Sequence, residues 1–227
     1  MIQLVKIGNI NLTEHKPALK MGGFLSINVS VDMNPFCQSM RNSSTICSKC
    51  YARYMEQQYP RLKNTLEENY ITLSSRVLDE SEISEIAEYI LKHAKGLRFD
   101  SIGELINETH CDNLNLIAMK VKSISANFPI TIWTKKAALS NAIDRTYIKK
   151  IFSNALIDEP LNEVPRDFDG VFNVCSYEWF LKNKMEPNCT GHCAYCMACY
   201  DPQFTGFIIY EMLKQDQNRL KRSGIWL

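Results

Sequence analysis

The sequence of 227 residues lacks any long hydrophobic run. No segment approaches the roughly 18–20 consecutive apolar residues that a membrane-spanning helix needs. The first residues, Met1–Ile7, lack the long apolar core and the small-residue cleavage site of a secretory signal. These absences predict a cytoplasmic protein without a membrane partner, in a reducing compartment where disulfides are rare.

An excess of one charge is also lacking, because 26 basic side chains face 25 acidic ones and the formal net charge is +1. This balance provides no long-range attraction for a polyanion, so the overall charge argues against nucleic-acid binding. Two basic runs have the spacing of a solvated helix face. They are Lys135, Lys136, Arg145, Lys149 and Lys150, and Lys214, Arg219, Lys221 and Arg222.

Linkers rich in Gly, Ser or Pro are absent, as are internal repeats and low-complexity segments. The hydrophobic fraction of 45% and the length are those of a globular protein with one good-sized core. We therefore expect a single domain over residues 1–227, with an α/β core over about 1–180. A cysteine-rich segment and a C-terminal helix are expected over about 185–227.

Apolar residues recur alternately at the spacing of strands and at the spacing of helices. The expected strands are 23–31, 97–100, 130–133 and 170–174, and the expected helices are 51–76, 79–95, 114–124, 137–143 and 206–222. Strands that alternate with helices imply crossover connections and a mostly parallel sheet, so the fold class is α/β. In such sheets, open or closed, ligands bind beyond the carboxyl ends of the strands.

Residues with reactive side chains recur at these strand ends. They are Cys37 after the first strand, Gly103 and Glu104 after the second, Lys135 and Lys136 after the third, and Cys175 after the last. Their recurrence predicts a ligand site at this edge of the sheet.

Four of the nine cysteines fall within one short segment near the C-terminus: Cys189, Cys193, Cys196 and Cys199. The last three form a C-x2-C-x2-C run, which resembles iron–sulfur ligation. A cubane cluster presents several iron corners, so one tight loop can supply thiolates to three of them. Zinc sites usually pair two separate ligand pairs. A 4Fe–4S cluster is therefore predicted; the alternatives are zinc, with His192 replacing one cysteine, and unligated thiols.

Three further cysteines, Cys37, Cys47 and Cys50, form an N-terminal set with spacings of nine and two residues. Three ligands leave one iron of a 4Fe–4S cluster open, and an open iron can bind and activate a small molecule. The alternative is a closed structural metal site completed by Cys175 or Cys111. Cys111, at a helix start, is more typical of a buried apolar residue.

Two residues beside these cysteines are candidates for ligand binding. Gly103 permits a tight turn, and the Glu104 carboxylate after it could bind the ammonium of an amino-acid-like ligand. A solvated loop acid or a helix cap is the alternative for Glu104. Tyr51, directly after Cys50, either packs in the core or covers the cluster.

At these positions the chain resembles the bacteriophage gene-product-88 family. The similarity is a pattern over most of the chain, carried by Cys47–Ala52, Arg98–Glu104, Ile132–Lys135 and Cys193-x2-Cys196-x2-Cys199. The same layout is similar to the radical S-adenosylmethionine superfamily, whose signature is three cysteines after the first barrel strand and an aromatic residue beside the last. This sequence departs from that signature in its first spacing, which is nine residues instead of three, and in Ile102 where a glycine is usual.

The superfamily resemblance implies a partial (β/α) barrel in which Gly103 and Glu104 contact the methionine amino group of S-adenosylmethionine. It also implies an auxiliary cluster on the C-terminal cysteines, an unidentified substrate and an electron donor. The phage resemblance implies action in the host cytoplasm. The alternative function is a non-catalytic phage binding protein stabilised by an iron–sulfur cluster or zinc.

Overall fold

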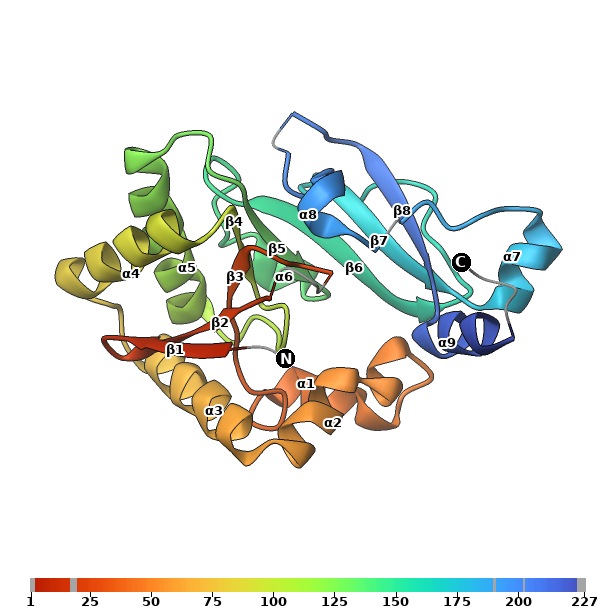
Figure 1. Cartoon of the computed structure of the whole chain (residues 1–227), viewed down its shortest axis with the longest axis horizontal. Coiled ribbons are helices and arrows are strands. Elements are labelled where there is room, and N and C mark those ends of the chain that lie inside the picture. Colours follow the sequence, from red (N-terminus) through yellow and green to blue (C-terminus); the bar gives the residue numbers. More distant parts are fainter. Residues whose placement is uncertain (1–2, 17–19, 190, 202, 224–227) are drawn as a thin grey trace.

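The computed structural model describes residues 3–16, 20–189, 191–201 and 203–223. Within these residues the chain forms one eight-stranded sheet whose strands lie side by side in sequence order (Figure 1). The strands are β1 (Gln3–Ile7), β2 (Ile10–Glu14), β3 (Phe24–Ile27), β4 (Gly96–Phe99), β5 (Ile130–Thr134), β6 (Lys149–Ile157), β7 (Gly170–Cys175) and β8 (Phe207–Met212).

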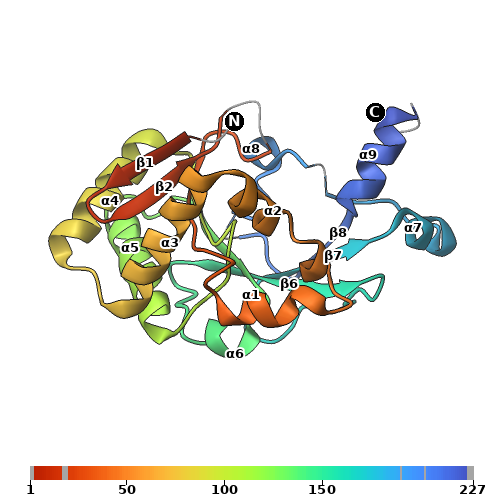
Figure 2. The ribbon, with the colours of Figure 1, turned by 90° about the horizontal axis from the view of Figure 1, so that it is seen from below.

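Helices occupy most connections between the parallel strands. They are α1 (Pro35–Ser39), α2 (Tyr51–Gln58), α3 (Pro60–Ser75), α4 (Glu80–His93), α5 (Glu108–Ile124), α6 (Ala137–Ser140), α7 (Tyr177–Asn183), α8 (Cys193–Cys196) and α9 (Lys214–Arg222), with 3-10 turns η1 (Met40–Asn42) and η2 (Ile46–Lys49). Figure 2 shows α7 and α9 near the β7–β8 end of the sheet, and α4 and α5 toward the opposite end. No helix of the described ranges has the length and apolarity needed to cross a bilayer.

The pairing of the strands confirms the expected α/β class. β1, β2 and β3 pair antiparallel, and β3 through β8 pair parallel without exception. Parallel neighbours need long crossovers, and the helices provide them. The mostly parallel sheet therefore places the loops that follow β3 to β8 at one edge, where ligands bind in such folds.

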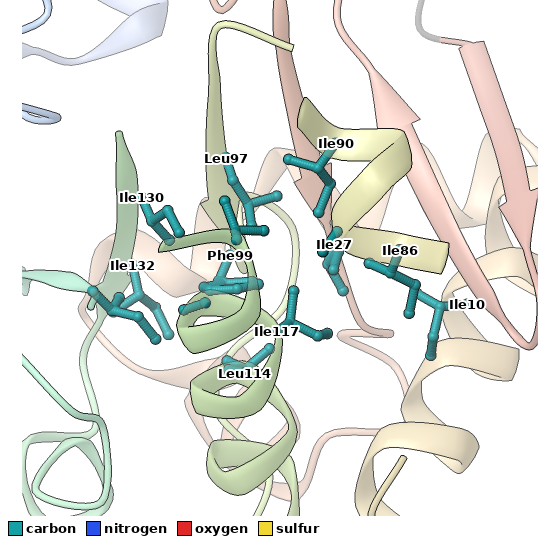
Figure 3. Packing of buried hydrophobic residues seen from close by; sticks show 14 of the residues in the cluster. Ile10, Ile27, Ile86, Ile90, Leu97, Phe99, Leu114, Ile117, Ile130 and Ile132 are labelled. Carbon is teal, nitrogen blue, oxygen red and sulfur yellow. The ribbon is translucent and has the colours of Figure 1, made fainter. Parts of the chain in front are cut away.

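Side-chain alternation gives this sheet two different faces. On the outer face, aliphatic and aromatic side chains of β3, β4 and β5 pack against α4 and α5 in the main core (Figure 3). This contact includes Ile27, Leu97, Phe99 and Ile132 of the strands and Ile86, Ile90, Leu114 and Ile117 of the helices. The alternate residues of β3, β4 and β5, among them Arg98 and Trp133, lie on the inner face, where polar groups gather.

The helix expected over 79–95 is confirmed as α4, and its start shows why the sequence was informative. Asp79 accepts hydrogen bonds from the backbone N–H groups of Ser81 and Glu82, both at 2.9 Å, while the Glu82 carboxylate accepts the Asp79 N–H at 3.1 Å. This reciprocal capping satisfies donors that a helix start leaves unpaired.

Other expected elements need correction. The helix expected over 51–76 is two helices, α2 and α3, because Pro60 begins a new helix after Tyr59. The tail expected to be helical over 206–222 is half strand, because Phe207–Met212 forms β8 beside β7 and only α9 is helical. Strand β6 and the β1–β2 hairpin were not predicted.

The first basic run is also not a solvated helix face. Lys149 and Lys150 lie in β6, are 6% and 2% exposed, and project to opposite faces of the sheet. Their buried ammonium groups donate to main-chain carbonyls instead of facing water. The second run, on α9, is exposed as expected.

Candidate metal centre

The loop after β3 carries the N-terminal cysteine group, which consists of Cys37, Cys47 and Cys50. Cys37 lies in α1, Cys47 in η2, and Cys50 is the residue before α2. Burial raises the pKa of the Cys37 thiol, and the negative charges of Glu104, Cys50 and Cys47 raise it further. The charges of Glu104 and of the two other cysteines thus act on Cys37. The nine residues between Cys37 and Cys47 are taken up by the end of α1 and by the 3-10 turns η1 and η2.

Asn34 joins this loop to the loop after β4. Its side chain is buried, caps α1 by accepting the Phe36 N–H at 3.0 Å, and donates to the main-chain oxygen of Glu104 at 2.7 Å. One residue thus fixes the position of Cys37 relative to Glu104. Sequence reasoning missed Asn34; the Asn-Pro pair that begins α1 was the available signal.

Glu56 of α2 holds the start of the same loop. Its buried carboxylate accepts hydrogen bonds from the Ser30 hydroxyl at 2.9 Å and the Val31 N–H at 2.7 Å. Burial raises the pKa of Glu56, and these hydrogen bonds oppose the rise. Because α2 follows Cys50 directly, Glu56 ties the end of β3 to the helix beyond the last cysteine of the group.

Glu104 sits in a tight turn after β4 that only glycine at position 103 permits. Gly103 has φ of +102°, and a Cβ atom there would lie 2.4 Å from the Val29 carbonyl oxygen. Glu104 is 2% exposed, so the alternative of a solvated loop acid is wrong. Its carboxylate accepts hydrogen bonds from the Thr134 hydroxyl, the Lys135 N–H at 2.8 Å and the Leu105 N–H at 3.0 Å.

Two further side chains border the N-terminal group. Tyr51 is 63% exposed and its hydroxyl donates to the Ser101 carbonyl at 2.9 Å, so it bridges the cysteine loop to the β4 loop and is not core packing. Burial raises the pKa of the Cys47 thiol, whereas the positive charge of Lys135 lowers it. Lys135 therefore provides a positive charge for the N-terminal cysteine group, whose thiolates would be negative.

The C-terminal cysteine group consists of Cys189, Cys193, Cys196 and Cys199. Cys193 and Cys196 bound α8, and Cys199 lies in the turn that follows; Thr190 lies outside the described residues. Burial raises the pKa of the Cys199 thiol to about 12, and the charges of Cys193, Cys189 and Cys196 contribute to the rise while Arg98 opposes it. Cys189 and Cys199 pack against the apolar cluster of Trp133, and Cys193 and Cys199 pack with Tyr200, so three of the four cysteines lie next to the inner face of the sheet.

Lys149 of β6 fixes the turn that carries Cys199. Its ammonium donates to the carbonyls of Ala198 at 2.8 Å and Phe204 at 2.5 Å, and also to the carbonyl of Asp201. A buried ammonium with three carbonyl acceptors holds the surrounding chain tightly. This contact links the C-terminal cysteine segment to the sheet, although the two lie about 50 residues apart in sequence.

Cys175 and Cys111 lie apart from both cysteine groups. Cys175, the last residue of β7, is buried on the outer face with Phe180, Met212 and Leu220. Cys111 is buried in the main core, where its thiol donates to the Leu139 carbonyl at 3.7 Å. We therefore assign neither to a metal site, although Cys175 was a candidate extra ligand by its position at a strand end.

Within the described ranges, no three Cys, His, Asp or Glu side chains form a group that could hold a metal ion. No protein-family model, curated protein or solved structure matches this chain. The function is therefore argued from the arrangement of the two cysteine groups and the polar residues around them.

A buried acid–base pair lies beneath the Glu104 loop. Neither carboxylate oxygen of Asp100 has a hydrogen-bond partner, and Oδ1 lies 4.0 Å from Nε2 of His110. His110 Nδ1 accepts the Ile106 N–H at 3.2 Å, which leaves Nε2 to carry the proton of the neutral ring. Burial raises the pKa of Asp100 well above its usual value and lowers the pKa of His110 to about 3.

These opposite shifts predict opposite pH dependences when either partner is replaced. Where the folded protein keeps a proton on Asp100 that the unfolded chain has lost, folding is favoured as the pH falls, while His110, which is protonated only in the unfolded chain, opposes folding. Relative to wild type, His110→Asn should gain stability as the pH falls, and Asp100→Asn should lose it. Each slope should differ from wild type by about 1.4 kcal/mol per pH unit.

Urea unfolding at several pH values measures these slopes. Subtracting the wild-type free energy of unfolding at each pH removes the contribution of all other titrating groups. Two variants with the same pH slope as wild type would show that the pair is not shifted in the way described.

Proposed function

We propose that this chain is an iron–sulfur protein and a radical S-adenosylmethionine-like enzyme. In this proposal the N-terminal cysteine group binds a 4Fe–4S cluster with one open iron, and the C-terminal cysteine group binds an auxiliary cluster. The observation that carries the proposal is that three cysteines lie in the loop after β3, which Asn34 joins to Glu104, and that four others lie in and around α8. The two remaining cysteines are buried elsewhere.

The chemistry of the donor sets fits such clusters. Burial and the neighbouring charges keep these thiols protonated, so a bound metal centre would displace their protons and supply the positive charge that the resulting thiolates need. Lys135 beside the first group, and Lys20 and Arg98 beside the second, provide positive charge for the anionic products of that binding. Arg98, Trp133 and Tyr200 also carry buried polar atoms without a protein partner near the second group.

The order of the strands supports a partial barrel. Six parallel strands, β3 to β8, follow one another in sequence order, as in the wall of a (β/α) barrel. The N-terminal group follows the first parallel strand and Glu104 follows the second, which are the positions that the resemblance to the radical S-adenosylmethionine superfamily requires.

When bound, the cluster of the N-terminal group would supply one-electron chemistry to a ligand on its open iron. The chain itself would bind and orient that ligand. The Glu104 carboxylate already accepts three hydrogen bonds and keeps one acceptor position for an ammonium. Tyr51 and Ser101 close the side of the site between α2 and the β4 loop.

The resemblance to the phage family places this activity in the host cytoplasm, with an unidentified substrate and a separate electron donor. The second candidate function is a non-catalytic, metal-stabilised phage binding protein. The exposed basic residues of α9 favour it, because they present Lys214, Arg219, Lys221 and Arg222 to a partner.

Anaerobic purification followed by iron, sulfide and zinc analysis tests the proposal. We expect brown protein with iron and acid-labile sulfide in similar amounts, and a reduced-state paramagnetic resonance signal that S-adenosylmethionine changes. Colourless protein with stoichiometric zinc would contradict both clusters. Iron without any response to S-adenosylmethionine would remove the enzyme and leave the binding protein.

A further inference from the structure

Arg98 stands on the inner face of β4 with its positive charge uncompensated. Its guanidinium lies over the Trp133 ring at 4.0 Å from the ring centroid, and its Nη1 makes a long contact of 3.8 Å to the Met21 sulfur. Its Nε is buried without a partner, and within the described part of the chain it forms no ion pair. Arg98 as a whole is half-buried, but a buried Nε–H donor is unfavourable unless an acceptor or an anion lies against it.

Two more unpartnered donors lie beside Arg98. The buried Trp133 indole N–H lacks a hydrogen-bond partner, and the buried Tyr200 hydroxyl, which has the Arg98 guanidinium beside it, has no acceptor for its own proton. Each such group is unfavourable as long as it stays unpaired. Three donors of this kind in one place are therefore evidence for an acceptor that the protein itself does not provide.

The surroundings of these donors identify that acceptor. Cys189 and Cys199 pack against the apolar cluster that contains Trp133, and Cys199 also packs against the cluster that contains Tyr200 and Cys193. Arg98 reaches the same region through its contact with the Trp133 ring. All three donors thus border the C-terminal cysteine group.

We propose that Arg98, Trp133 and Tyr200 donate hydrogen bonds to the sulfur atoms of the metal–sulfur centre on the C-terminal cysteines and thereby raise its reduction potential. Donors and positive charge near the sulfurs stabilise the reduced form, which carries one more negative charge. The inference rests on the proposed function and deepens it, because it assigns electron transfer to the C-terminal centre in addition to stabilisation of the fold.

The location of the donors agrees with electron transfer between the two sites. Ile46, which precedes Cys47 of the N-terminal group, packs against the same apolar cluster as Cys189 and Cys199. The packed side chains of Trp133 and its cluster therefore lie between the N-terminal and the C-terminal cysteine groups.

Redox titration of the anaerobically purified full chain tests this inference. Dithionite supplies one electron per cluster, and paramagnetic resonance follows the reduction. The signal of the C-terminal cluster is identified as the one that the Cys196→Ser variant lacks. Arg98→Gln should lower the equilibrium constant for reduction about tenfold, which is about 59 mV for one electron. Trp133→Phe and Tyr200→Phe each remove only a donor and should shift the potential in the same direction by less.

Matched controls separate this effect from general disturbance. Trp179→Phe on α7 and Tyr89→Phe on α4 make the same chemical changes outside the C-terminal cysteine group and should leave the potential unchanged. Arg98→Lys keeps the charge and serves if Arg98→Gln does not fold. Wild-type iron content with unchanged potentials in Arg98, Trp133 and Tyr200 variants overturns this inference alone. Zinc in place of iron overturns the proposed function as well.

Discussion

Replacing Glu104 by Ala should lower the free energy of unfolding by about 3 kcal/mol, because the change leaves buried donors without an acceptor. The carboxylate is 2% exposed and receives hydrogen bonds from the Thr134 hydroxyl and from the Lys135 and Leu105 N–H groups. These contacts connect the ends of β4 and β5. Urea unfolding of the purified variant measures the loss.

Glu88→Ala on the exposed face of α4 is the matched control and should change stability by less than about 0.5 kcal/mol. Glu104→Gln keeps the size of the side chain but presents an NH2 group to backbone donors, so it should also be destabilised. A Glu104→Ala variant as stable as the Glu88 control would show that the carboxylate does not organise the loops.

Replacing Cys196 by Ser should remove iron and sulfide from the C-terminal site and lower the melting temperature. Cys196 is exposed and belongs to no described core cluster, so the substitution itself should have little effect on packing. A stability loss would therefore report the metal-binding free energy that is coupled to folding. A loss of about 3 kcal/mol corresponds to roughly 6–12 °C in a protein of this size.

Cys111→Ala provides the opposite control. It removes a buried thiol from the main core and should lower stability through packing while iron binding is retained. If Cys196→Ser loses iron but melts like wild type, the C-terminal centre is peripheral to the fold. If it keeps its iron, Cys196 is not a ligand.

The sequence by itself determined the parts of this protein that depend on local patterns. Period-two alternation placed β3, β5 and β7, and a helical stripe with a capping residue at Asp79 placed α4. Cysteine spacing separated the two candidate metal sites, and the succession of elements gave the α/β class. Each of these signals lies within a few residues of chain, so no tertiary information was needed.

Only the tertiary structure decided where polar residues are buried and which reactive groups meet. Lys149 is charged and belongs to a basic run with helical spacing, yet it lies in β6, between β5 and β7. Burial is possible there because three carbonyls of a loop distant in sequence accept hydrogen bonds from its ammonium. Cys175 lies at the end of a strand and Cys37 lies in a loop that follows one. The alternation of side chains along β7, however, places Cys175 on the outer face of the sheet. The contacts of Asn34 with Glu104, and of Arg98 with Trp133, join residues far apart in sequence, and no local pattern encodes such pairs.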